Sequence, residues 1–97
     1  MRYAHVCYRI NEVERSLAFY CGALGFEELR RYPIRDEAVN IYVAPKGSED
    51  TPLELTFNFG RTEPYEIGTG YGHIAYHVED LDGTLAQIGR ASCRERV

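Results

Sequence analysis

The stretch YAHVCYRINEVERSLAFY, residues 3–20, decides the fold, because residues 71–88 repeat it as YGHIAYHVEDLDGTLAQI. The two copies are offset by 68 residues. Five aligned pairs are identical: Tyr3 and Tyr71, His5 and His73, Tyr8 and Tyr76, Leu17 and Leu85, and Ala18 and Ala86. Most other positions match in kind, for example Val6 with Ile74. Agreement of this density indicates that one structural unit is repeated.

Each copy changes its periodicity part-way along. It begins with alternating apolar and polar residues, which predict a half-buried strand, and continues with apolar residues at helical spacing. In the first copy, Asn11 followed by Glu14 predicts a capping box, and Gly22 and Gly25 predict the end of the helix. Strands are predicted between the turn-rich segments that follow, at residues 27–32, 38–44 and 53–57. The unit is therefore expected to be βαβββ, and the fold class α+β.

The repeat also predicts how the chain is organised. Two units of this period would make about 136 residues, because a repeat unit ordinarily buries its open face against its partner. We expect residues 1–87 to form a partial domain, in which 1–70 are the first module and 71–87 begin an incomplete second module. Residues 88–97, IGRASCRERV, are rich in arginine and lack amphipathic spacing, which predicts a non-native tail; a frayed basic C-terminus is the alternative. A chain truncated in this way is expected to be inactive by itself.

Composition argues against several classes of function. The net charge of −4 and the lack of a basic stripe interleaved with aromatic residues give nucleic acid little to bind. No apolar run is long enough to predict a membrane span, and no leader peptide precedes the first alternating residues. The three cysteines have no CxxC spacing, which argues against a disulfide framework and a thiolate zinc site. A soluble, cytoplasmic protein is expected.

Strand alternation predicts which side chains share a face. His5 and Arg9 lie on the same side of the first strand, and Glu54 and Asn58 lie on the same side of the strand LELTFN. His73 takes the place of His5 in the second copy. Each of these polar groups faces away from the apolar residues of its own strand.

Two imidazoles and one carboxylate, on His5, His73 and Glu54, make a candidate site for a divalent transition metal ion. A single histidine in a strand is more often a packed or surface residue, and a carboxylate facing solvent is the ordinary case. The recurrence of His5 as His73 at the same place in a repeated unit favours the ligand interpretation. His77, which replaces Arg9 in the second copy, is not expected to be a ligand.

Four stretches together resemble glyoxalase I, of the vicinal oxygen chelate superfamily, in its compact bacterial form. They are His5 with Arg9, RSLAFYCGALGF at 15–26, LELTFNFG at 53–60 and YEIGTGYGHIAYHVED at 65–80. The resemblance runs continuously from Met1 to about Gln87. The segments ending in FNFG and containing GYGHIA are typical of glyoxalase I, whereas the helix motif is found across the superfamily.

This resemblance implies paired βαβββ modules and a metal ion held by two His and two Glu, of which His5, Glu54 and His73 are present. It implies that Glu54 acts as a ligand and a second base, while the main base lies outside this chain. Arg9 and Asn58 are implied to contact glutathione. The implied reaction isomerises the hemithioacetal of methylglyoxal and glutathione to S-lactoylglutathione, with nickel or cobalt in preference to zinc, in a homodimer.

Three alternatives stay open at this point. They are a thiol transferase or a ring-opening dioxygenase of the same superfamily, and a metal-free protein that binds a small molecule. Arg9 with Asn58 favours the glutathione enzyme over the first two, and the His and Glu ligands favour it over the third. Thr69 stands where longer relatives carry an arginine, which leaves one further glutathione contact in question.

Overall fold

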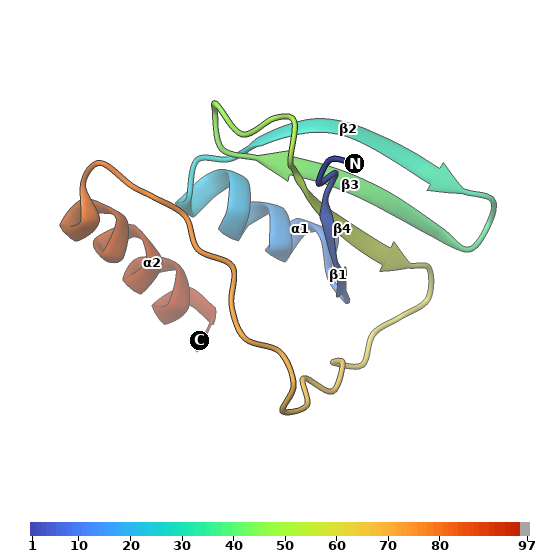
Figure 1. The fold of residues 1–97 in the computed structure, drawn as a ribbon. Coiled ribbons are helices and arrows are strands. Elements are labelled where there is room, and N and C mark those ends of the chain that lie inside the picture. Colours follow the sequence, from blue (N-terminus) through green and yellow to red (C-terminus); the bar gives the residue numbers. More distant parts are fainter. Residues whose placement is uncertain (96–97) are drawn as a thin grey trace. The chain divides into compact units, whose positions relative to one another are not determined.

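The computed structural model describes the backbone of residues 1–95 and the side chains of residues 1–89. It divides into two units, Met1–Tyr65 and Glu66–Val97, and each is described by itself. The elements are β1 (Val6–Ile10), α1 (Val13–Leu17), the π-helical segment η1 (Ala18–Ala23), β2 (Glu27–Ile34), β3 (Ala38–Ala44), β4 (Leu53–Asn58) and α2 (Leu81–Glu95) (Figure 1).

The first unit is a four-stranded mixed sheet in the order β1-β4-β3-β2. β1 runs parallel to β4, and β3 is antiparallel to both β4 and β2. The chain leaves β1, crosses through α1 and η1, and returns to add β2, β3 and β4 (Figure 1). This arrangement confirms the predicted βαβββ unit and the α+β class.

One face of the sheet forms the core. Ile41 and Val43 on β3 and Leu55 on β4 are fully buried, and Phe26 is nearly so. On β1, Cys7 and Arg9 are exposed, and the residues that alternate with them, Val6, Tyr8 and Ile10, are partly buried. The predicted alternation of the first strand is therefore confirmed, and it leaves the polar side chains on the opposite face.

The start of the first helix differs from the prediction. The N-cap is Glu12, and no side chain makes a capping hydrogen bond there. Asn11 lies one residue before this N-cap, and its Nδ2 donates to the backbone carbonyl of Thr62 at 3.3 Å. The predicted capping box was therefore wrong, because the helix begins one residue later than the box requires.

The end of that helix is also reached in a different way. Gly22 lies inside η1, so it does not end the helix. The last turn widens to π geometry, in which Leu24 N donates to Phe19 O. Gly25 then adopts φ +74°, a left-handed conformation that suits glycine at this position. Only the second of the two predicted stop signals is used.

In the second unit, the predicted strand at 71–78 is not formed. A strand needs a neighbour to bond its backbone, and residues 71–78 pair with no strand among the residues described. The helix predicted after it is confirmed as α2, which begins after Asp80; the Asp80 Oδ1 accepts a hydrogen bond from Gly83 N at 3.1 Å.

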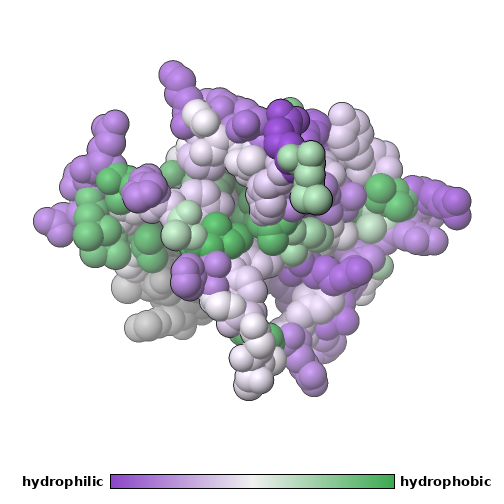
Figure 2. Space-filling view, in the orientation of Figure 1, coloured by the Kyte–Doolittle hydropathy of each residue, from purple (hydrophilic) through white to green (hydrophobic). Residues whose placement is uncertain are grey.

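α2 presents exposed Leu81 and Leu85, and Figure 2 shows apolar residues on its surface. The helix continues into the expected tail at 88–97, most of whose side chains lie outside the described residues. Within the part of the chain that the structure covers, no helix has both the length and the apolar character needed to cross a membrane.

Candidate metal centre

Three side-chain pairs join β1 and the residue before it to β4 across the polar face of the sheet. They are His5 with Glu54 at 3.1 Å, Cys7 with Thr56 at 3.2 Å, and Arg9 with Asn58 at 2.6 Å. The parallel register pairs the Cα atoms of Cys7 and Glu54, so each β1 side chain reaches a neighbouring position on β4. The predicted common face of the first strand and of LELTFN is thereby confirmed, and the structure brings the two sets of groups into contact.

Glu54 is the buried member of this face, with 8% of its surface exposed, while 40% of the His5 side chain is exposed. Oε2 of Glu54 lies 3.1 Å from Nε2 of His5 and accepts a hydrogen bond of 2.5 Å from the Tyr42 hydroxyl. Thr56 Oγ1 lies 3.2 Å from the other oxygen, Oε1. One carboxylate oxygen is therefore bound from the neighbouring strand β3 and the other from Thr56 on the same strand.

Two opposing effects set the acidity of Glu54. Burial raises the pKa of its carboxyl, but hydrogen bonds from Tyr42, Cys7 and Thr56 together with the nearby His5 lower it by more. The resulting pKa lies below the ordinary value of a glutamate. Glu54 is therefore an anion at neutral pH, which is the form that binds a cation.

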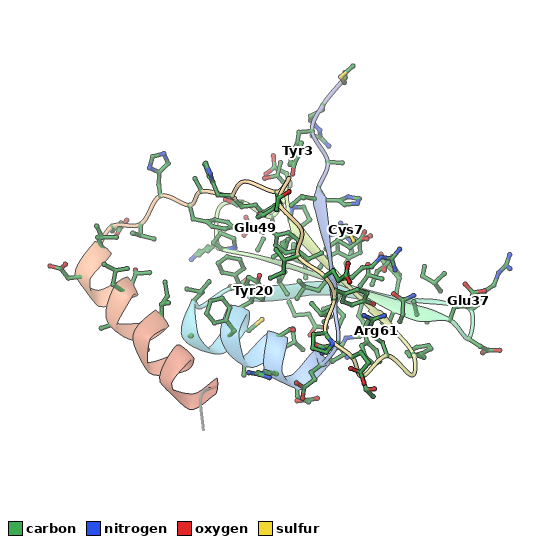
Figure 3. All side chains as sticks on the ribbon, turned by 90° about the horizontal axis from the view of Figure 1, so that it is seen from below. Tyr3, Cys7, Tyr20, Glu37, Glu49 and Arg61 are labelled. Carbon is green, nitrogen blue, oxygen red and sulfur yellow. The ribbon has the colours of Figure 1, made fainter. Side chains whose placement is uncertain are left out.

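Burial raises the pKa of the Cys7 thiol, and the carboxylate of Glu54 raises it further, against a lowering hydrogen bond from Thr56 and the charge of Arg9. The thiol therefore stays protonated at neutral pH. Cys7, which Figure 3 labels, is an exposed neutral group between the positions of His5 and Arg9 in the alternation of the strand.

The sequence analysis missed the contribution of β3 and β2. The register places Tyr42 opposite Glu54 and Asn40 opposite Thr56, while Arg30 on β2 is opposite Tyr42. Asn40 Oδ1 accepts a hydrogen bond of 2.8 Å from the Thr56 hydroxyl. The alternation in AVNIYVA, residues 38–44, was the signal that would have found them, since Asn40 and Tyr42 alternate with the apolar residues that form the core.

Tyr42 is the most constrained aromatic residue of the polar face. Its hydrogen bond to Glu54 raises its pKa to about 12, with burial and the Glu54 charge acting in the same direction. The His5 ring meets it edge-on at 5.6 Å between centroids, and the Arg30 guanidinium lies 4.3 Å from its ring centroid. A single phenol thus contacts two of the predicted metal ligands.

A second cluster lies at the other end of the β1–β4 pair. Asn58 Oδ1 accepts from Arg9 and lies 3.5 Å from the Tyr65 hydroxyl. The guanidinium of Arg61 lies 3.9 Å from the Tyr65 ring centroid and donates to the backbone carbonyls of Glu63 and Pro64. The loop after β4 is therefore folded back so that it borders Arg9 and Asn58, the two predicted glutathione contacts.

The donor set agrees in part with the predicted metal site. The imidazole of His5 and the carboxylate of Glu54 converge, and both are ligand types of nickel, cobalt and zinc. His73 is exposed in the second unit, whose position relative to the first is not defined. The described residues contain no cluster of three or more His, Cys, Asp or Glu side chains able to hold a metal ion. His5 and Glu54 thus fit two ligand positions, and the role of His73 stays a prediction.

Comparison with known proteins places this geometry in context. Residues 4–94 match the family model of the glyoxalase/bleomycin resistance protein/dioxygenase superfamily. The chain is 40% identical over 86 residues to a probable lactoylglutathione lyase of Synechocystis, covering 87% of this chain and 65% of that protein. It is also 40% identical over 92 residues to a lactoylglutathione lyase of Neisseria meningitidis, covering 93% of this chain and 66% of that protein.

Among solved structures, the trypanothione-dependent glyoxalase I of Leishmania major matches with a TM-score of 0.82 and 33% identity, over 95% of this chain and 67% of that one. Glyoxalase I of Zea mays matches with a TM-score of 0.80 and 30% identity, over 92% of this chain and 32% of that one. The chain therefore spans only part of these longer proteins, and less than two thirds of the Synechocystis relative.

Proposed function

Because the chain belongs to the glyoxalase/bleomycin resistance protein/dioxygenase superfamily, we propose that it serves the metal-dependent isomerisation of the hemithioacetal of methylglyoxal and glutathione to S-lactoylglutathione. The names of its relatives support this choice within a superfamily of several activities. The structural observation that supports it best is the convergence of His5 and Glu54, at 3.1 Å, on the same face as Arg9 and Asn58.

The proposed ligands of the divalent ion are His5, Glu54 and His73, and the proposed metal is nickel or cobalt in preference to zinc. Such an ion supplies Lewis acidity, which stabilises negative charge that develops on substrate oxygens. The low pKa of Glu54 supports its part in this set, since the carboxylate needs no deprotonation before it binds a cation.

Arg9 and Asn58 are the proposed anchors of glutathione. Their groups differ in kind: the guanidinium suits a carboxylate, and the amide suits the peptide groups of a tripeptide. They are already aligned by their mutual hydrogen bond of 2.6 Å, which lowers the cost of ordering them when a ligand arrives. If glutathione binds at this end of the β1–β4 pair, the reacting carbons attached to it would lie on the side of Glu54.

The proposed chemistry moves two protons within the substrate. The C–H proton leaves the carbon of the hemithioacetal that bears sulfur and is returned to the neighbouring carbonyl carbon, and the hydroxyl proton of the first carbon passes to the oxygen of the second, so substrate and product are isomers and no redox partner is consumed. Glu54, as an anion held by Tyr42 and Thr56, is suited to act as a second base beside its role as ligand. We place this activity in a cytoplasmic homodimer, following the family resemblance and the free cysteines.

A nickel titration tests the proposal. Isothermal calorimetry should detect binding of Ni²⁺ to the chain. His5→Gln should weaken nickel binding at least tenfold. His77→Gln, which removes an exposed imidazole in the second unit, is the matched control and should leave it unchanged. Equal binding by the two variants, or no binding by the unaltered chain, would contradict the proposed site.

A further inference from the structure

The polar face contains one residue that touches two proposed metal ligands at once and has no role in the proposed chemistry. We propose that Tyr42 is the positioning residue of the metal centre, fixing Glu54 through its hydroxyl and His5 through its ring. This inference rests on the proposed function, because it assumes that His5 and Glu54 bind the ion. It concerns the phenol on β3, which is not itself a ligand in this proposal.

The hydroxyl contact fixes one carboxylate oxygen. Tyr42 donates to Oε2 of Glu54 at 2.5 Å, and the two residues are directly opposite each other on β3 and β4. A carboxylate oxygen has two lone pairs, so this bond leaves one available on Oε2. Nε2 of His5 lies 3.1 Å from the same oxygen. The bond from Tyr42 therefore fixes the carboxylate beside the imidazole.

The ring contact restrains the second ligand. The His5 and Tyr42 rings meet edge to face, with an interplanar angle of 83° and centroids 5.6 Å apart. His5 lies just before β1, outside the hydrogen-bonded strand, so strand pairing does not fix its side chain. Contact with a neighbouring ring supplies the restraint that the strand does not. One side chain thus limits the rotation of both donors.

Tyr42 can do this because its own ring is in contact with two side chains of β2. The Arg30 guanidinium lies 4.3 Å from the ring centroid, within the range of a cation–π contact, and the Tyr32 ring meets it at 6.2 Å and 71°. Both neighbours come from β2, the edge strand next to β3. Restraint therefore passes from β2 through Tyr42 to the ligands, as expected of residues that orient the groups bound to a metal.

Tyr42→Phe tests the inference because it removes the hydroxyl and keeps the ring. Nickel affinity measured by calorimetry should fall about 10- to 100-fold, the range found when a group that orients a metal ligand is removed. Tyr32→Phe removes a hydroxyl from the same face without touching Glu54, and its affinity should stay within about threefold. The visible absorption spectrum of bound Co²⁺ should change in Tyr42→Phe and not in Tyr32→Phe, which distinguishes altered ligand geometry from a general loss of stability.

The outcomes separate this inference from the proposed function. If the unaltered chain binds nickel and Tyr42→Phe binds it equally well, the positioning role is refuted and the metal site stands. If the unaltered chain binds no nickel, both are refuted. Should Tyr42→Phe fail to fold, Arg30→Gln decides, because it removes the cation over the ring and keeps the hydroxyl. A several-fold weaker nickel affinity in Arg30→Gln is expected, and an unchanged affinity would refute the role of Tyr42.

Discussion

Replacing Asn58 by aspartate separates the stability of the polar face from its capacity to hold glutathione. Asn58 Oδ1 accepts a hydrogen bond of 2.6 Å from the Arg9 guanidinium. In Asn58→Asp a carboxylate takes the place of the amide with almost the same shape. The guanidinium then gains a permanent counter-ion, so the fold should be kept while the binding group is neutralised.

The size of each effect follows from this contact. At 2.6 Å, two unit charges attract by about 1.6 kcal/mol in bulk water. Salt and side-chain ordering reduce an exposed pair to about 0.2–1 kcal/mol, and Arg9 is exposed, so a gain in unfolding free energy in that range is expected. A charge-assisted hydrogen bond from Arg9 to glutathione would be worth about 1.5–3 kcal/mol. Its loss corresponds to about a 10- to 100-fold weaker affinity.

Urea denaturation followed by circular dichroism measures the first effect, and calorimetry with glutathione measures the second. Gln87→Glu makes the same amide-to-carboxylate change at an exposed position on α2, and it controls for net charge. Glutathione affinity equal to that of the unaltered chain in Asn58→Asp would refute the assignment of Arg9 and Asn58. Destabilisation by more than about 1 kcal/mol would refute the geometry of their contact.

Three further predictions concern packing, backbone conformation and proton linkage. Leu55→Ala truncates a side chain with 0% exposure and should lower the unfolding free energy by about 2.7–5.0 kcal/mol. Leu85→Ala, at 54% exposure, should change it by less than about 0.5 kcal/mol. Equal effects of the two variants in urea denaturation would contradict the assignment of Leu55 to the core. Gly25→Ala, at φ +74°, should lower the unfolding free energy by about 1–2 kcal/mol. Gly22→Ala, where a Cβ atom meets open space within η1, should raise it by about 0.5–1 kcal/mol. Melting temperatures of the two variants that move in the same direction would contradict this. The pKa of Tyr42 is raised to about 12, chiefly by its hydrogen bond to Glu54, so the contribution of this bond to stability is complete below about pH 10 and lost as the pH rises toward 12. Tyr42→Phe should lack this loss of stability. Parallel profiles of unfolding free energy for the two proteins between pH 9 and 12 would contradict the prediction.

Much of the fold was predictable because side-chain alternation follows directly from strand geometry. The bounds of the strand at 38–44 were predicted correctly. The strands predicted at 27–32 and 53–57 are longer in the structure and end at Ile34 and Asn58, respectively. Alternation also predicted the common face of His5 and Arg9 on the first strand. These inferences need only the order of residues along one strand.

The parts that failed depend on contacts between distant segments. The contact of Tyr42 with Glu54 requires that β3 lie beside β4 in one particular register, which no local pattern specifies. Asn11 has a sequence context suited to capping, but its amide bonds to Thr62, 51 residues away. Residues 71–78 alternate as a strand does and have no pairing partner among the described residues. Alternation states which face a side chain takes, and the neighbouring strand decides what that side chain meets.

The parallel pairing of β1 and β4 has a consequence for the order of folding. β2, β3 and β4 pair with their neighbours in sequence, whereas the paired residues of β1 and β4 are 47 positions apart, as Val6 and Leu53 are. Loops of that length close late, because their entropy must be overcome before any contact forms. A cation would then find His5 and Glu54 together only in molecules that have closed this last loop. Metal capture during refolding would mark the completion of the sheet and would have no part in starting it.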